Sequence, residues 1–191
     1  MTKILAFAGS SRKDSFNKKL VKIAAAGAES TGATVTVIDL ADYPMPIFNE
    51  DLEAEQGMPE TARAFKQLLI EHDGFLIASP EYNSAFSPLL KNAIDWASRP
   101  GSKEEPRLVA FQGKVAVLMA ASPGALGGMR GLVFLRMLLG NLGVVVLPDQ
   151  QTVPQAFEAF NEDGILANAK KQQAILNLGS KLSQAVKGLQ G

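Results

Sequence analysis

The chain has 191 residues, which is enough for one domain with a full hydrophobic core and no covalent cross-links. It contains no cysteine, which excludes disulfides and thiolate metal sites and fits a reducing compartment. Its 19 basic and 19 acidic residues balance, so no net positive charge favours binding to nucleic acid or to an anionic membrane.

The N-terminus lacks the basic segment, apolar segment and cleavage site of a secretory signal. No apolar run reaches the roughly 18 to 20 residues that a membrane span needs. We therefore expect a single soluble domain over residues 1–191, located in the cytoplasm.

Short apolar runs alternate with longer amphipathic stretches, a pattern typical of βαβ units and of a parallel sheet covered by helices on both faces. The predicted strands are 3–8, 33–38, 74–79, 113–120 and 143–147. The predicted helices are 15–30, 59–71, 87–98, 128–142 and 163–188. Two segments are predicted to be loops, 42–49 and 99–112, and the acidic residues 50–55 are interpreted as a solvated stretch.

The most informative stretch is the polar segment Gly9–Asn17, which directly follows the first apolar run. A buried strand, a polar loop and then a helix is the arrangement with which α/β proteins hold a phosphate, because the free N–H groups of the helix point at the anion. The segment also supplies neutral and charged donors: Ser10, Ser15, Asn17 and the guanidinium of Arg12. These residues predict a pocket for a terminal phosphate.

Several other kinds of site are excluded by the motifs that are missing. The loop has only Gly9 where a dinucleotide fingerprint needs three glycines, and the chain contains no Walker A loop. No G-x-S-x-G motif is present, and His72 is the only histidine, so neither serine hydrolysis nor a histidine metal site is expected. We interpret His72 as a surface or helix-capping residue.

Two further polar loops follow buried strands, at Ser79–Asn83 and at Ser122–Gly128. Ligands of open parallel sheets bind outside the carboxyl ends of the strands, and with a strand order of 2-1-3-4-5 all three loops would meet there. A phosphate pocket beside an aromatic residue, an amide and glycine backbone fits a mononucleotide with a broad ring system. Flavin mononucleotide, FMN, matches this description.

The three motifs resemble those of the NADPH-dependent FMN reductase family, and within it the bacterial branch that includes chromate and quinone reductases. They are Gly9-Ser10-x-Arg12-x-x-Ser15-x-Asn17, Ser79-Pro80-Glu81-Tyr82-Asn83 and Ser122-Pro123-Gly124-x-x-Gly127-Gly128. The resemblance covers roughly residues 3–147 and implies a flavodoxin-like three-layer sandwich with a five-stranded parallel sheet of order 2-1-3-4-5.

The resemblance also implies the residues of the cofactor site. The FMN phosphate would be held by Ser10, Arg12, Ser15, Asn17 and the backbone N–H of Phe16. The isoalloxazine ring and ribityl chain would be lined by Pro80, Glu81, Tyr82 and Asn83, with Ser122 and Gly124 at the pyrimidine side. No metal and no catalytic acid or base is expected, because flavin chemistry depends mainly on position, electrostatics and access.

The implied activity is the transfer of two electrons, as a hydride, from NADPH or NADH through FMN to a small-molecule acceptor. Quinones, azo compounds, metal oxyanions such as chromate, and free flavin are the acceptor classes implied. The alternative is a flavodoxin-like electron carrier or flavin redox sensor that does not react with NAD(P)H. Such a carrier would show an acidic docking face, and this sequence shows no acidic excess.

The resemblance implies a homodimer or homotetramer whose subunits meet near the flavin. Glu81 is an unexpected neighbour for an electron-rich flavin, and an ion pair across a subunit contact, with Arg99 or Arg130, is the alternative role for it. Trp96 is expected to pack either on the sheet or on a partner subunit. No residue can be assigned to the 2′-phosphate of NADPH.

Overall fold

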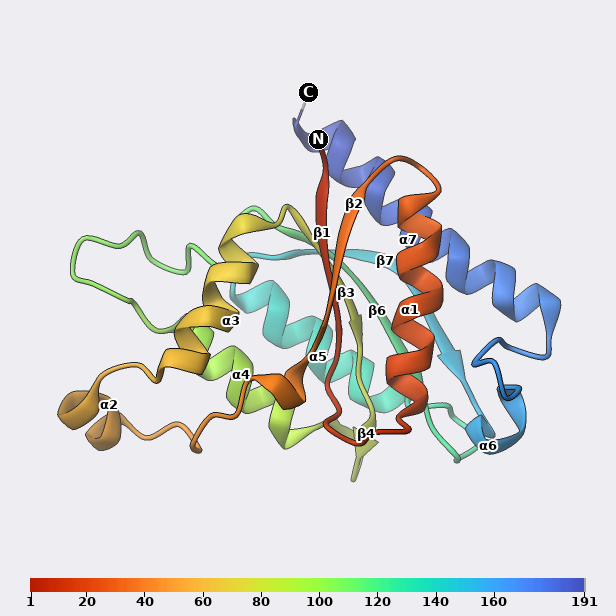
Figure 1. The fold of residues 1–191 in the computed structure, drawn as a ribbon, viewed down its shortest axis with the longest axis horizontal. Coiled ribbons are helices and arrows are strands. Elements are labelled where there is room, and N and C mark those ends of the chain that lie inside the picture. Colours follow the sequence, from red (N-terminus) through yellow and green to blue (C-terminus); the bar gives the residue numbers. More distant parts are fainter. Residues whose placement is uncertain (191) are drawn as a thin grey trace.

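A computed structural model describes residues 1–190 and is built on one five-stranded, all-parallel sheet of order β2-β1-β3-β6-β7 (Figure 1). Its strands are β1 Lys3–Ala8, β2 Thr34–Asp39, β3 Gly74–Ala78, β6 Val115–Ala121 and β7 Val145–Val153. The two remaining strands, β4 Glu81–Tyr82 and β5 Ala85–Phe86, form a separate antiparallel hairpin. The predicted order 2-1-3-4-5 is therefore confirmed once the hairpin is set aside.

Helices cover both faces of this sheet. The helices are α1 Phe16–Glu29, α2 Glu50–Gln56, α3 Glu60–Glu71, α4 Pro88–Ser98, α5 Met129–Asn141, α6 Ala156–Ala159 and α7 Ala169–Gln190, with a 3-10 turn at Leu40–Asp42. Helices α1 and α7 pack on one face, and α3, α4 and α5 pack on the other, which gives the expected three layers. None of the described helices is long and apolar enough to cross a membrane.

The central strands are buried on both faces, as a parallel sheet between helix layers requires. Alternate residues of β1 enter different cores: Ile4 and Ala6 contact the α1 and α7 side, whereas Leu5 and Phe7 contact the α3, α4 and α5 side. The continuous apolar runs in the sequence are thus explained by two cores that share one sheet.

Helices α1 and α7 cross through two glycines. A Cβ atom at Gly27 would lie 1.9 Å from the carbonyl oxygen of Leu176, and one at Gly179 would lie 1.8 Å from that of Ala24. The Ser180 hydroxyl donates to the Gly27 carbonyl at 2.8 Å in the same crossing. The backbones of the two helices therefore touch, which fixes the position of α1 against the sheet.

Three segments differ from the sequence-based expectation. The acidic stretch is solvated, as expected, but it is helical: it forms α2, because Asn49 caps it and acidic residues in its first turn suit the helix dipole. Strand β7 runs past Pro148 to Val153, because a shift in its pairing with β6 takes up the extra residues. Helix α7 begins at Ala169 rather than near 163, because residues 160–166 first form a turn closed by a Phe160–Leu166 bridge.

The structure also decides between the alternative positions expected for Trp96 and between those expected for His72. Trp96 is fully buried, and its Nε1–H donates to the carbonyl of Pro46, so it packs within the chain. His72 ends α3 and is 5% exposed, with Nδ1 2.6 Å from the Leu68 carbonyl and Nε2 2.8 Å from the Thr36 hydroxyl. The capping role of His72 is confirmed, and it is a buried residue, not a surface one.

The close contact of α1 and α7 at Gly27 and Gly179 predicts how stability responds to substitution there. Gly27→Ala should lower the free energy of unfolding by about 3 kcal/mol, because the new methyl group collides with rigid backbone. Gly140→Ala is the control, since a Cβ at Gly140 of α5 meets nothing within 4 Å; it should stabilise the helix by up to about 1 kcal/mol. Urea unfolding followed by circular dichroism measures both. Equal stability of the two variants would contradict the crossing.

Candidate functional site: a pocket at the carboxyl edge of the sheet

The loops after β1, β3 and β6 meet at one edge of the sheet and enclose a pocket of about 230 Å³. The lining residues are Ser10, Arg12, Ser15, Phe16, Asn17, Pro80, Glu81, Tyr82, Ala121, Ser122, Pro123 and Phe157. All the residues expected from the sequence are among them except Asn83 and Gly124. The three motifs, far apart in the sequence, thus come together as expected.

The start of the β1–α1 loop is fixed from two sides. The Gly9 N–H donates to the carbonyl of Ala78 at 2.8 Å, and the Gly9 carbonyl accepts a hydrogen bond from the Ser87 hydroxyl at 2.5 Å. The same Ser87 oxygen caps α4 by accepting from the Leu90 N–H, as the Ser87-Pro88 pair predicts. The loop therefore leaves the sheet in a defined direction.

Asn17 ties the far end of this loop to β6. Its side-chain oxygen accepts from the Ala121 N–H and its side-chain nitrogen donates to the Ala121 carbonyl, both at 2.9 Å. Asn17 is 3% exposed. Its amide therefore holds the loop in place, and a contribution to a bound anion would come from its main-chain N–H.

The first turn of α1 presents unpaired donors to the pocket. The Lys19 N–H is the first to bond within the helix, to the Ser15 carbonyl, which leaves the N–H groups of Phe16, Asn17 and Lys18 without a helical partner. Ser15 occupies the N-cap position in extended conformation, yet its hydroxyl makes no capping hydrogen bond. This helix end offers an anion both a positive dipole and a free hydroxyl.

An aromatic cluster forms the outer wall of the pocket. The guanidinium of Arg12 lies 5.5 Å from the ring centre of Phe16, which makes edge contact with Phe157 and stacks on Phe160. Phe157 on the short helix α6 is 72% exposed and lines the pocket. Phe157 could not be expected here from the sequence, because no motif marks its segment and only the fold brings α6 beside Ser122.

The β4–β5 hairpin carries the second motif. Its two turn residues, Asn83 and Ser84, have φ values of 50° and 69°, the left-handed conformation that a tight two-residue turn requires. Tyr82 is 54% exposed beside the pocket, whereas Asn83 lies at the tip of the hairpin and does not line the pocket.

Glu81 connects the hairpin to the N-terminus of α5 within the same chain. Its carboxylate pairs with Arg130 at 2.6 Å and accepts from the Gly131 N–H at 3.1 Å. Burial raises the pKa of Glu81, but the hydrogen bond from Gly131 and the charge of Arg130 outweigh burial and hold it below the ordinary value of 4.5. Arg130 is thus the partner of Glu81, and Arg99 instead pairs with Glu53.

The glycines of the third loop serve two purposes. A Cβ at Gly127 would lie 2.7 Å from the Pro154 nitrogen, and one at Gly128 would lie 2.7 Å from the Cβ of Ala120. These two glycines are therefore needed by the packing of the protein itself. Gly124, in contrast, has only the Ser122 hydroxyl within 4 Å and stays open.

These features fit FMN. Free N–H groups, two buried serines and Arg12 surround a place for a phosphate, and an aromatic hairpin and an open glycine lie beside it. Among the described residues no cluster of histidine, aspartate and glutamate could hold a metal ion.

Comparison with known proteins agrees with this arrangement. The profile of the NADPH-dependent FMN reductase family matches residues 2–158. A NAD(P)H-dependent FMN reductase of Pseudomonas aeruginosa is 34% identical over 99% of this chain and 97% of its own. A NAD(P)H:quinone oxidoreductase of Solanum tuberosum is 34% identical over 91% of this chain and 87% of its own.

A solved structure is also similar. It is the flavoenzyme NAD(P)H:acceptor oxidoreductase FerB of Paracoccus denitrificans, which superimposes with a TM-score of 0.80 at 28% identity and covers 98% of each chain. The chain therefore belongs to the NADPH-dependent FMN reductase family and is an oxidoreductase with a flavodoxin-like fold, FMN as cofactor and NAD(P)H as co-substrate.

Proposed function

We propose that this protein passes two electrons from NAD(P)H through FMN to a quinone, with FMN held in the pocket described above. The observation that carries the proposal is the open N-terminus of α1, where three N–H groups, Ser15 and Arg12 surround one place for a dianion. A helix end of this kind binds phosphate through aligned donors and the helix dipole.

The phosphate of FMN would be bound by the sequence-predicted set of Ser10, Arg12, Ser15 and the N–H groups of Phe16 and Asn17. Ser10 and Ser15 are 6% and 3% exposed, so their hydroxyls have few competing waters. Arg12 is exposed and lies over the Phe16 ring, which keeps its guanidinium near the phosphate without burying an unpaired charge.

The ring system would extend along the hairpin and the third loop. The pocket is too small to enclose all of FMN, so one face of the ring would stay open above Tyr82. Pro80 and Tyr82 would border the ring, Ser122 and Gly124 would lie at its pyrimidine edge, and Asn83 would act from the hairpin tip. Glu81 would act indirectly, by fixing the hairpin to α5.

Bound FMN supplies the redox chemistry, since it accepts a hydride from NAD(P)H and delivers it, together with a proton from solvent, to the acceptor. The chain positions the reactants and stabilises charge. In the third loop the N–H groups of Ser122, Gly124 and Gly127 are bonded to Val153, the Ser122 hydroxyl and Gly124. Stabilisation of negative charge there would therefore fall to the remaining N–H groups, those of Ala125, Leu126 and Gly128. No residue is assigned as acid or base.

Quinones are the acceptor that the relatives favour. Besides the potato enzyme, a 2-hydroxy-1,4-benzoquinone reductase of a Burkholderia species is 35% identical over 87% of this chain. These relatives give no support for azo compounds or chromate, whereas the name FMN reductase, carried by the family and by the Pseudomonas aeruginosa relative, makes free flavin the second candidate acceptor. The electron-carrier alternative is disfavoured, because the family consists of NAD(P)H-dependent reductases and the chain has no acidic excess.

The absence of cysteine is consistent with a protein that functions in a reducing compartment, and we propose the cytoplasm.

The protein is further proposed to form a homo-oligomer through α5. Val133, Phe134 and Met137 follow one another at helical spacing and are 59%, 46% and 60% exposed, next to Met129 at 44%. A contiguous apolar surface of this kind marks an interface. A second copy is the favoured occupant because the surface starts at the α5 end that Glu81 joins to the pocket, so the contact would lie beside the flavin.

The first prediction concerns FMN affinity. Arg12→Ala should weaken FMN binding by about tenfold to a hundredfold, as expected from the loss of a charge-assisted hydrogen bond worth about 1.5–3 kcal/mol. Titration of the apoprotein followed by flavin fluorescence measures the dissociation constant. Arg107→Ala, at an exposed arginine of the 99–112 loop, is the control and should bind FMN as the parent does. Unchanged affinity in Arg12→Ala would remove Arg12 from the phosphate site.

The second prediction concerns turnover. The FMN-loaded protein should lose the yellow absorbance of its oxidised flavin when it is mixed anaerobically with NADPH in a stopped-flow instrument. Addition of a benzoquinone should restore the absorbance. Absence of bleaching would contradict the reductase and favour the electron carrier. Bleaching that a quinone does not reverse would contradict the choice of acceptor alone.

The third prediction concerns assembly. Val133→Lys should convert the oligomer to monomer, because burial of a lysine in an apolar contact leaves its charge unpaired. Ile47→Lys, at an apolar residue that is 86% exposed in a loop, is the control and should leave the mass unchanged. Light scattering after size exclusion reports the mass. A monomeric parent protein would refute the proposed interface.

A further inference from the structure

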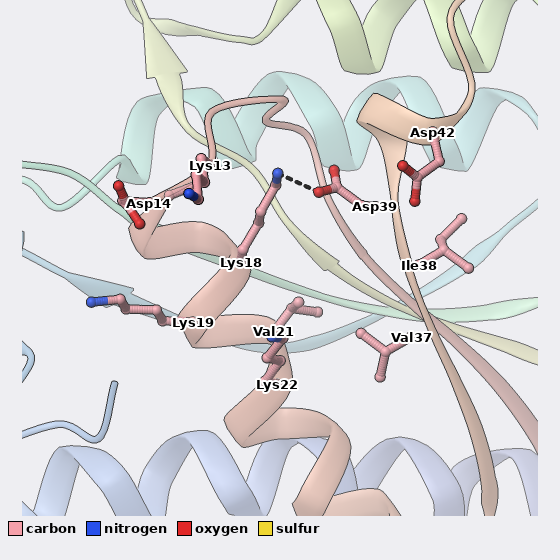
Figure 2. A pocket seen from close by; sticks show the side chains of 11 residues that line it. Lys13, Asp14, Lys18, Lys19, Val21, Lys22, Val37, Ile38, Asp39 and Asp42 are labelled. Atoms are coloured by element: carbon pink, nitrogen blue, oxygen red, sulfur yellow. Dashed lines mark hydrogen bonds and ion pairs between the residues drawn. The ribbon is translucent and has the colours of Figure 1, made fainter. Parts of the chain in front are cut away.

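The proposed FMN pocket contains one charged side chain that the phosphate does not use, the carboxylate of Glu81. Among the residues that line the pocket, only Arg12 and Glu81 are charged, and Arg12 is proposed to hold the phosphate. Charged residues of the adjoining loop and of α1 line a separate hollow between α1 and the end of β2, where Lys18 pairs with Asp39 (Figure 2). Glu81 is therefore the charged group that the ring system of FMN would meet.

A negative charge beside the ring would oppose its reduction. A hydride that adds to FMN brings negative charge onto the ring system. A carboxylate nearby would repel this charge, and the repulsion is strong where little water screens it. The side chain of Glu81 is only 7% exposed. Without compensation, Glu81 would therefore make bound FMN harder to reduce.

The start of α5 supplies the compensation. The guanidinium of Arg130 donates to one oxygen of Glu81 at 2.6 and 2.9 Å, and the Gly131 N–H donates to the other oxygen at 3.1 Å. The N-cap residue of α5, Gly128, makes no side-chain capping bond, so Glu81 caps this helix from the hairpin. A cation and the positive end of a helix thus face one carboxylate.

The packing around this ion pair allows its charge to be changed without moving the hairpin. A Cβ at Gly131 would lie 3.2 Å from the main chain of Ala85, so the first turn of α5 lies directly against β5. The side chain of Arg130 is 56% exposed, so its replacement leaves no internal cavity. Glutamine at either position keeps an amide that can form hydrogen bonds and removes only the charge.

We propose that Arg130 sets the reduction potential of bound FMN by neutralising the charge of Glu81. The proposal rests on the proposed function, because it needs FMN in this pocket. Arg130 acts through Glu81 and is a positioning residue for the reaction. Together the two residues fix the hairpin to α5 and leave no net negative charge beside the ring.

The test varies the net charge of the pair and measures the midpoint potential of bound FMN by spectroelectrochemical titration. Arg130→Gln should lower the potential by about 30 mV, which corresponds to about a tenfold change in the equilibrium constant of a two-electron reduction. Glu81→Gln should raise the potential by a similar amount, because the charge of Arg130 is then uncompensated. The double variant Glu81→Gln/Arg130→Gln should return to the parent value, because neither charge remains.

The matched control is Arg99→Gln. It breaks an ion pair of the same kind, with Glu53, and neither residue lines the pocket, so the potential should stay at the parent value. For a variant that binds FMN weakly, the dissociation constants of oxidised and reduced FMN give the same quantity, since their ratio fixes the shift in potential.

The sign of the shifts separates a role in charge from a role in structure alone. An unchanged potential in Arg130→Gln, or shifts of the same sign in both single variants, would overturn the proposal, since the pair would then only hold the hairpin. The potential is measured without NAD(P)H, so the proposed function is tested separately. FMN that binds but stays oxidised in the presence of NADPH would refute the proposed function instead.

Discussion

The site depends on the pair of hydrogen bonds between the Asn17 amide and the main chain of Ala121. They hold the first turn of α1 against the end of β6. The position is buried, so loss of either hydrogen bond would leave polar groups unsatisfied. Because the helix start cannot move toward the sheet, its N–H groups stay directed into the pocket. The proposed phosphate site is therefore already formed before any ligand binds, which would reduce the entropic cost of binding.

The same logic extends to the two other loops. Glu81 fixes the hairpin to α5, and the Ser122 carbonyl of the third loop accepts from the Ala156 N–H of α6. With Ser87 of α4 fixing the Gly9 carbonyl of the first loop, each loop at the carboxyl edge is tied to a helix other than its own. The position of α1 is in turn determined by its contact with α7 through Gly27 and Gly179, where the backbones touch. Helix α7, which carries none of the motifs, thus contributes to the site by holding the helix that presents the proposed phosphate donors.

Sequence reasoning succeeded where local chemistry determines the structure. The apolar runs gave the strands, Ser87-Pro88 gave the start of α4, and the polar loops after β1, β3 and β6 gave most of the pocket lining. It failed where a distant partner decides: Phe157 joins the pocket only because α6 hydrogen bonds to Ser122, and β7 passes Pro148 only through a bulge that Arg136 supports. No sequence pattern shows that Asn17 bonds to a residue 104 positions away.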